Sequence, residues 1–501
     1  MNRSSRPPDR GGARPGSIGI GLQPTALFGL CAASLVLAHL LGGGTRPALL
    51  SDAILQLLCI PLLIVAGHAV LQASSWTGQR AGLVLLSGVV ILPLVQLIPL
   101  PPAIWSRLPS HEAVRETYSL LEAPLPWWPL TLSPSATMQS ALALIPPVAI
   151  FLATLRLGWP ERRLLSLLLV GLGLVSVVLG LLQFAQGPRS ALRFYAFTNP
   201  TEAVGFFANR NHFAAVLYAT FLFAAVWAVE ALKVWSGTSR TRRVETVSVI
   251  FASIALVAVV LLVSGQMMAR SRAGLGLMMA ALVGALAIAL LTKQRRSEAR
   301  SWGGLAAMAA FAVLFALQFS LYRILARFQS DPFEDARVPF ARNTLEAALA
   351  HLPFGSGLGT FVDVYGRFEA PRDAFGAYAN RAHNDLLEVL LETGVPGAIL
   401  IIAGLICCAL RARTLWTTAG DAEPIDRNLA RAATLVIALL LLHSLVDYPL
   451  RTASLATLAA FSAALMCAAP PATVAPVPPP RRTRRISRTA APSTSARRSA
   501  S

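Results

Sequence analysis

The sequence has little charge, little cysteine and no Asp-x-Asp pair. Only 13% of its 501 residues are charged, against about 25% in a typical soluble domain, which excludes an ordinary soluble protein. The five cysteines lie inside apolar stretches without metal-ligand spacing, so we expect packed side chains and neither a disulfide framework nor a zinc site. No Asp-x-Asp pair or metal-ligand constellation is evident. We therefore expect no metal, no nucleotide and no other cofactor.

Long apolar runs take the place of the missing charge. Hydrophobic residues make up 55% of the chain, and the mean hydropathy is +0.60. A helix of about 20 residues that is apolar on all sides spans a bilayer, and the alternating pattern of a membrane barrel is missing. The sequence predicts an all-α, polytopic membrane protein with about 12 transmembrane helices. The expected spans are residues 22–42, 49–73, 82–100, 137–155, 164–185, 211–232, 246–265, 273–292, 302–322, 384–410, 429–446 and 453–469.

Composition divides the chain into five parts. Disordered basic tails are expected at 1–21 and 470–501, because both are rich in Arg with Pro, Ser or Gly. Between them we expect an N-terminal bundle of about nine helices at 22–322, a large outer loop with short helices at 323–383, and about three C-terminal helices at 384–469. The net charge of +19 lies mainly in short loops and tails. That pattern is typical of cytoplasmic loops, not of a nucleic-acid-binding face, and it places both termini in the cytoplasm.

Two shorter outer loops precede the large one. The first, 101–136, is rich in Pro and Trp, and its Trp105, Trp127 and Trp128 are expected to anchor it at the membrane interface. The second, 186–210, leads into the sixth span.

The large loop itself carries two recognisable patterns. Residues 335–349 are predicted to form an amphipathic helix whose apolar side carries Phe340, Leu345 and Leu349. The glycine-rich stretch 352–361 lacks the Lys-Ser/Thr of a phosphate-binding loop. A tight turn that packs the loop onto the membrane domain is therefore favoured over a phosphate site.

A cluster of titratable residues ends the large loop, where an apolar helix is expected to begin. His383 and Asn384 are followed by Asp385, Glu388 and Glu392 at helical spacing. Histidine changes its charge near neutral pH and is a suitable general base. The three carboxylates are expected chiefly to pair with the arginines at 210, 272, 337 and 342.

Arginines stand beside the spans on the same predicted face. Arg210, Arg270, Arg272 and Arg451 lie where ionisable residues are costly and are usually functional or paired. Each one alone could be an interfacial anchor, or could pair with a carboxylate such as Asp447. Four arginines on one side, with two histidines beside them, favour an anion site, because guanidinium offers phosphate a planar fork of donors.

Four motifs follow one another in a fixed order: Asn-Arg-Asn-His at 209–212, Ser-Arg-Ala-Gly at 271–274, two arginines followed by a glycine-rich turn at 337–361, and the stretch at 382–397 that begins Ala-His-Asn-Asp and ends Thr-Gly-Val-Pro-Gly. In this order they resemble the O-antigen ligase and polymerase superfamily, which contains lipopolysaccharide O-antigen ligases, Wzy-type polymerases and protein O-oligosaccharyltransferases. The resemblance covers roughly residues 200–450. The stretch 443–451 also resembles exopolysaccharide polymerases.

The resemblance implies transfer of a glycan from undecaprenyl diphosphate to a hydroxyl acceptor at the periplasmic face of the bacterial inner membrane. The acceptor would be a lipid A-core sugar, a growing polysaccharide or a protein Ser/Thr. His383 would act as the base or activate the acceptor, and Arg272 and Arg342 would clamp the diphosphate. His212 is expected either beside the catalytic residues or as a packed polar side chain. The implied substrate-binding residues are Arg210, His212, Arg337, Asn384 and Arg451.

Two other classes of protein remain as alternatives. A flippase or transporter for lipid-linked oligosaccharide fits the number of spans, but transporters carry paired repeats and polar or broken helices near the midplane. Here the polar residues gather around one outer loop. A non-catalytic scaffold would leave the His-Asn and arginine motifs unexplained. The expected partners are the glycan donor, the acceptor and the bilayer, without nucleic acid.

Overall fold

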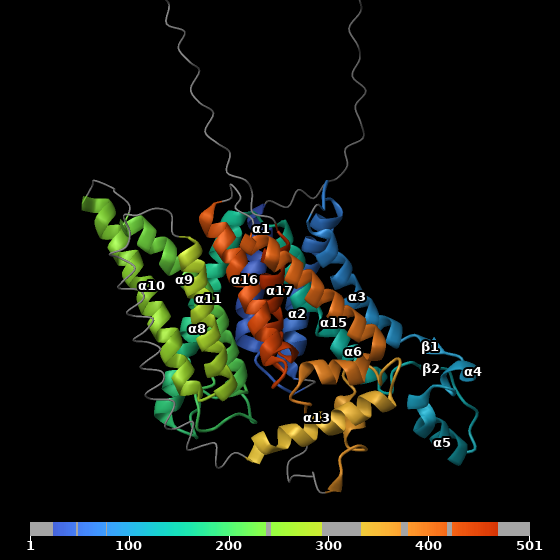
Figure 1. Cartoon of the computed structure of the whole chain (residues 1–501). Coiled ribbons are helices and arrows are strands. Elements are labelled where there is room, and N and C mark those ends of the chain that lie inside the picture. The colour runs from blue at the N-terminus through green and yellow to red at the C-terminus, as the bar shows by residue number, and fades with distance from the viewer. Residues whose placement is uncertain are drawn as a thin grey trace, which may run out of the picture.

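The computed structural model describes residues 24–46, 49–76, 78–236, 242–292, 332–371, 379–417 and 423–468. Most of this part of the chain is helical (Figure 1), and its only strands are two residues long and pair antiparallel. The elements are α1 (Pro24–Leu41), α2 (Leu50–Leu71), α3 (Arg80–Gln96), β1 (Pro99–Leu100), α4 (Pro102–Trp105), η1 (Pro109–His111), α5 (Glu112–Leu120), β2 (Trp128–Pro129), α6 (Pro134–Leu142), α7 (Ile145–Arg156), α8 (Trp159–Gln186), α9 (Arg210–Ser236), α10 (Arg242–Ala269), α11 (Arg272–Leu291), α13 (Pro332–Ala350), α14 (Phe361–Tyr365), α15 (Asp385–Thr417), α16 (Pro424–His443), η3 (Pro449–Arg451) and α17 (Ala453–Cys467).

Every expected span within the described ranges contains a helix. Seven of the described helices are long and apolar enough to cross a membrane, while α1, α3 and α17 are apolar but shorter. This confirms a helical membrane fold. The count of about 12 spans and their topology stay predictions. The ninth expected span, 302–322, and the two tails lie outside the described residues.

Helix α9 forms the centre of the bundle, whereas α1 packs on several helices but keeps Gly29, Ala33 and Leu40 exposed. Helix α9 packs against α8, α10, α11 and α16, and α1 packs against α2, α7, α8 and α17. Apolar side chains surround α9 on all sides, and Phe213, Tyr218 and Phe223 are fully buried. Peripheral helices keep large apolar residues exposed, such as Ile64 on α2 and Phe251 on α10. Such an apolar outer surface is what a lipid environment requires.

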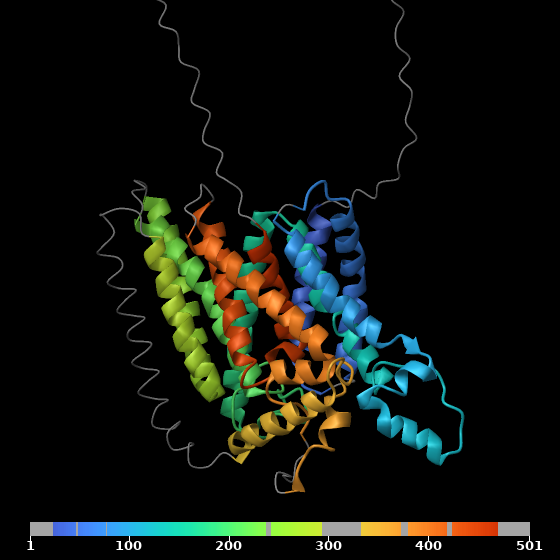
Figure 2. The same ribbon diagram turned by 45° about the vertical axis from the view of Figure 1, so that its right-hand side comes forward.

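Helix α13 lies across one end of the bundle, which we call the α13 end (Figures 1 and 2). The described chain begins and ends at the opposite end. At that opposite end, arginine side chains donate to carbonyl groups at helix C-termini, where a cation is favourable. The donors are Arg162 for α7, Arg411 for α17 and Arg431 for α15.

The tenth expected span is two helical segments joined by a kink. At Gly394 the backbone takes φ +58° and ψ −144°, and a Cβ there would lie 2.2 Å from the carbonyl oxygen of Pro353. Only glycine fits both conditions. The first turns of α15 therefore lie across the α13 end, and the remainder runs through the bundle (Figure 2).

The amphipathic helix exists, but its predicted apolar face is wrong. Phe340 is buried, whereas Leu345 is 42% and Leu349 59% exposed. The buried face continues through Asn343 and Thr344 to Ala347 and Ala348, at helical spacing. The small and polar side chains pack inward because α13 lies directly on α15 and α14.

The glycine-rich turn 352–361 packs as a tight turn, as expected. Gly355, Gly357 and Gly359 all have positive φ. A Cβ on Gly357 would overlap the Thr131 side chain, and the Leu358 amide donates to Gln96. The turn, which follows α13, thus packs against the end of α3 and against the segment before α6.

The Trp-rich loop forms an arm beside α3, built from β1, α4, η1, α5 and β2 (Figure 2). Trp105 is fully buried and donates to the Pro126 carbonyl oxygen, so its expected role as an interfacial anchor is wrong. Trp128 is half-buried against it. Trp127 is exposed, as an anchor would be.

Candidate active site

His383 stands immediately before α15 in a backbone conformation that is unusual for this residue. Its φ is +50°, and it precedes Asn384, whose side-chain oxygen accepts hydrogen bonds from the Leu386 and Leu387 amides. Asn384 therefore caps the helix, and its amide nitrogen donates to the Leu445 carbonyl oxygen. Both side-chain ends of Asn384 are thus engaged with the protein backbone. Non-glycine residues at positive φ cluster at functional sites.

Asp447 is the partner of His383. Its Oδ1 lies 3.2 Å from His383 Nδ1, and its Oδ2 accepts a 2.6 Å hydrogen bond from the Asn211 side chain. The carboxylate is fully buried. Because an ionised carboxylate only accepts, His383 Nδ1 must carry the donated hydrogen, which leaves the Nε2 lone pair to take a proton. The expectation that Asp447 pairs with an arginine is wrong.

The charge on Asp447 is stabilised by its surroundings. Burial by itself raises the pKa of this carboxyl, but the hydrogen bond from His383 and the nearby imidazoles of His383, His212 and His443 outweigh it and hold the pKa well below its usual range. Asp447 therefore stays ionised across the physiological range and fixes the orientation of the His383 ring.

Two aromatic rings enclose the His383 imidazole. Phe340 of α13 stacks on it with centroids 6.0 Å apart and 17° between planes, and Tyr448 meets it edge-on at 5.0 Å. Burial, together with the Asp447 charge, raises the pKa of Tyr448 to about 12, so its phenol stays neutral. Packing on both sides limits the ring to one position.

His212 lies on the other side of Tyr448. Its ring is fully buried and meets the Tyr448 ring at 5.0 Å, and neither of its nitrogens has a hydrogen-bond partner among the described residues. Deeper between α9 and α16, Tyr218 and His443 lie within hydrogen-bond distance. His212 is thus close to the site but does not touch Asp447 or His383 by a hydrogen bond.

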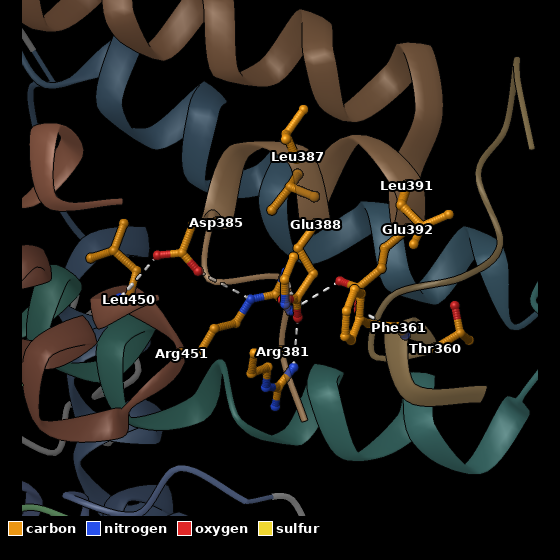
Figure 3. A network of polar contacts seen from close by, with 12 residues as sticks. Thr360, Phe361, Arg381, Asp385, Leu387, Glu388, Leu391, Glu392, Leu450 and Arg451 are labelled. Atoms are coloured by element: carbon orange, nitrogen blue, oxygen red, sulfur yellow. Dashed lines mark hydrogen bonds and ion pairs between the residues drawn. The ribbon is translucent and has the colours of Figure 1, made fainter. Parts of the chain in front are cut away.

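A buried ion cluster gathers around Arg451, and its carboxylates follow His383 in the chain (Figure 3). Arg451 is surrounded by three carboxylates, at 3.4 Å from Asp385, 3.5 Å from Glu388 and 2.9 Å from Glu392. The carboxylates raise the pKa of Arg451 even though its burial opposes this. The guanidinium is therefore occupied by the chain's own carboxylates, whereas the sequence pointed to substrate binding.

The ion cluster fixes the backbone on both sides of His383. Glu388 accepts from the Arg381 side chain at 2.8 Å and from the Ala382 amide at 2.9 Å. Asp385 accepts from Ser444 at 2.9 Å. The carboxylates do pair with arginines, as expected, but with Arg381 and Arg451.

The remaining predicted arginines stand on three elements, α9, α11 and α13. Arg210 precedes Asn211, pairs with Glu202 at 3.1 Å, and its amide donates to the Asn199 side chain. Arg272 begins α11, which Ser271 caps and which packs along α9. On α13, Arg337 and Arg342 flank the ring-stacking Phe340. Arg210 thus stands next to Asn211, which binds Asp447, and Arg337 and Arg342 lie on the helix that carries Phe340.

Comparison with known proteins agrees with the resemblance. The sequence model of the O-antigen ligase family matches residues 257–402, a segment that contains Arg272, α13 and His383. The match supports the resemblance to O-antigen ligases over this segment, which is less than half of the chain. Asp447 and Asn211 lie outside the matched segment. No curated protein matches the chain.

Proposed function

We propose that the protein transfers a glycan from undecaprenyl diphosphate to a hydroxyl acceptor, either a lipid A-core sugar or a growing polysaccharide. The observation that carries the proposal is the oriented His383–Asp447 pair, with arginines on the two helices that supply Asn211 and Phe340 to it. The pair suits proton removal from a hydroxyl, and the arginines suit a diphosphate leaving group.

The reaction would be a single displacement. The acceptor oxygen attacks the anomeric carbon while its proton passes to Nε2 of His383. The bond between that carbon and the phosphate oxygen breaks, and its electron pair stays on the diphosphate. Arg272 and Arg342 would stabilise the developing charge, with Arg210 and Arg337 as further contacts, because fixed cations at developing charge are usually a large catalytic contribution. One displacement inverts the anomeric configuration.

The α13 end would face the periplasm and both termini the cytoplasm, in a bacterial inner membrane. In support, the opposite end carries the arginines that cap α7, α15 and α17, as cytoplasmic ends tend to be basic. Energy would come from the activated lipid donor, without metal or nucleotide.

Two alternative functions would give different experimental results. A protein O-oligosaccharyltransferase would share the donor site and differ in the acceptor. A flippase for lipid-linked oligosaccharide would move the donor without breaking the phosphate–sugar bond. The chemical groups assembled at one end of the bundle favour transfer over transport.

The test is reconstitution in liposomes with undecaprenyl-diphosphate glycan and candidate acceptors, with EDTA and without nucleotide. We expect transfer by the parent protein, and a fall of roughly 10²–10⁴-fold for His383→Ala, the range typical of a lost general base. His68→Ala, which removes an exposed histidine of α2, is the control. Equal rates in parent and His383→Ala would reject the site. Donor translocation without transfer would favour the flippase.

A further inference from the structure

Exposed phenylalanines gather beside the candidate donor site. Phe194 is 57% and Phe197 62% exposed, and both lie in the loop between α8 and α9 that ends at Arg210. We define the phenylalanine shelf as Phe194, Phe197 and Phe206 with Arg46. Large apolar rings left exposed in this way mark interaction sites.

Each exposed ring of the shelf is supported on one face by the protein. Phe194 stacks on Phe206 with centroids 5.8 Å apart and 4° between planes. The Arg46 guanidinium lies 3.3 Å from the centre of the Phe197 ring. A ring held in this way has one face fixed against the protein and the rest available to a flat ligand. This prior ordering lowers the entropy that binding must otherwise overcome.

The loop that carries the shelf is rigidly held. The buried side chain of Gln183 on α8 donates to the Leu192 and Gly205 carbonyl oxygens and accepts from the Val204 and Gly205 amides. Arg193 donates to the Asn199 and Glu202 carbonyl oxygens. These bonds give the phenylalanine rings a defined position.

The shelf is held against the end of α1. Arg46 follows α1, and Phe206 packs on His39, which is buried near the end of that helix. The Ala208 amide donates to the Gly43 carbonyl oxygen and fastens the two loops together. By contrast Phe251, equally exposed at 62%, lies on the side of α10.

The same loop holds a residue of the candidate donor site. Asn199 accepts from the Arg210 amide, and Glu202 pairs with the Arg210 guanidinium. We propose that the phenylalanine shelf binds the glycan of the lipid-linked donor, with the apolar faces of sugar rings stacked on Phe194 and Phe197, a few sugars beyond the diphosphate. This rests on the proposed function, and it makes the shelf a determinant of donor length.

The test compares two donors that share the undecaprenyl diphosphate but carry either a full repeat unit or a single sugar. For Phe194→Ala/Phe197→Ala we expect KM for the long donor to rise about tenfold, equivalent to about 1.4 kcal/mol, with kcat and the single-sugar KM unchanged. Phe251→Ala is the matched control. An unchanged long-donor KM, or an equal rise for both donors, would overturn the proposal.

Direct binding separates this inference from the proposed function. The free oligosaccharide released from the donor should show saturation-transfer NMR contacts with the parent protein that are lost in the double variant, even if no transfer is detected. Trp fluorescence of Phe197→Trp should respond to that glycan and not to brominated lipid. Quenching by brominated lipid, without glycan binding, would make the shelf a membrane anchor and reject the inference.

Discussion

His383 Nδ1 and Asp447 Oδ1 lie 3.2 Å apart although 64 residues separate them in the chain. The two residues belong to segments on either side of the last two long helices, α15 and α16. Their contact orients the His383 imidazole, and the Phe340 and Tyr448 rings limit the position of that imidazole.

Asp447→Asn should reduce glycan transfer by roughly 10²-fold or more with little change in KM, because the ring loses the partner that fixes its tautomer. Steady-state transfer rates from a saturating donor measure this. Asp426→Asn, which alters an equally buried carboxylate at the opposite end paired with Arg163, is the control for folding. A variant that keeps half of the parent rate would remove Asp447 from the mechanism.

The lowered pKa of Asp447 predicts a pH dependence of stability. In the unfolded protein the Asp447 carboxyl has a pKa of about 3.9, and in the folded protein its pKa is lower. Its contribution to the free energy of unfolding is therefore fully present above the unfolded pKa and is lost as the pH falls through the folded pKa. The difference in Tm between parent and Asp447→Asn should therefore be constant from about pH 5 to 8 and shrink below about pH 4. Thermal unfolding in detergent measures it. A difference that grows on acidification would contradict the assignment.

Arg451→Met should destabilise the protein by about 3–5 kcal/mol, because three buried carboxylates lose their cation. Arg163→Met removes a more exposed ion pair and should cost less. Arg451→Lys should restore part of the loss. Chemical or thermal unfolding of the three variants tests this order, and equal stability of Arg451→Met and the parent would show that the cluster does not hold α15.

Gly394→Ala should destabilise the kink in α15 by at least about 1–3 kcal/mol from the backbone conformation alone, with the contact to Pro353 adding to this. Gly404→Ala, later in the same helix and with open space around it, should be neutral or stabilising by about 0.5–1 kcal/mol. The melting temperatures of Gly394→Ala and Gly404→Ala test this prediction. If both variants melt together, the kink does not depend on glycine.

The proposed orientation predicts the labelling of single cysteines in an otherwise cysteine-free protein. Leu349→Cys on the exposed face of α13 should react with an impermeant thiol reagent added to intact spheroplasts. Thr417→Cys at the opposite end should react only after lysis. The reverse pattern would place the α13 end in the cytoplasm.

The sequence by itself determined the helices and several of the polar segments between them, because both depend on local pattern. Apolar runs predict spans wherever they occur, and the helix at 335–349 and the turn at 352–361 follow from residues close in the chain. His383 was predicted from its own motif. The three carboxylates after it were expected to pair with arginines, but they meet Arg381 and Arg451 instead of the four arginines predicted.

Only the tertiary structure decided which side chains meet. Asp447 pairs with His383 and not with an arginine, and Arg451 turns to three carboxylates, because the segments before α15 and after α16 lie side by side. The buried face of α13 likewise depends on the elements beneath it, so Leu345 and Leu349 remain outside despite their hydrophobicity. Local pattern specifies each helix, but contacts between distant segments depend on how all the helices pack together, and no short stretch of sequence contains that information.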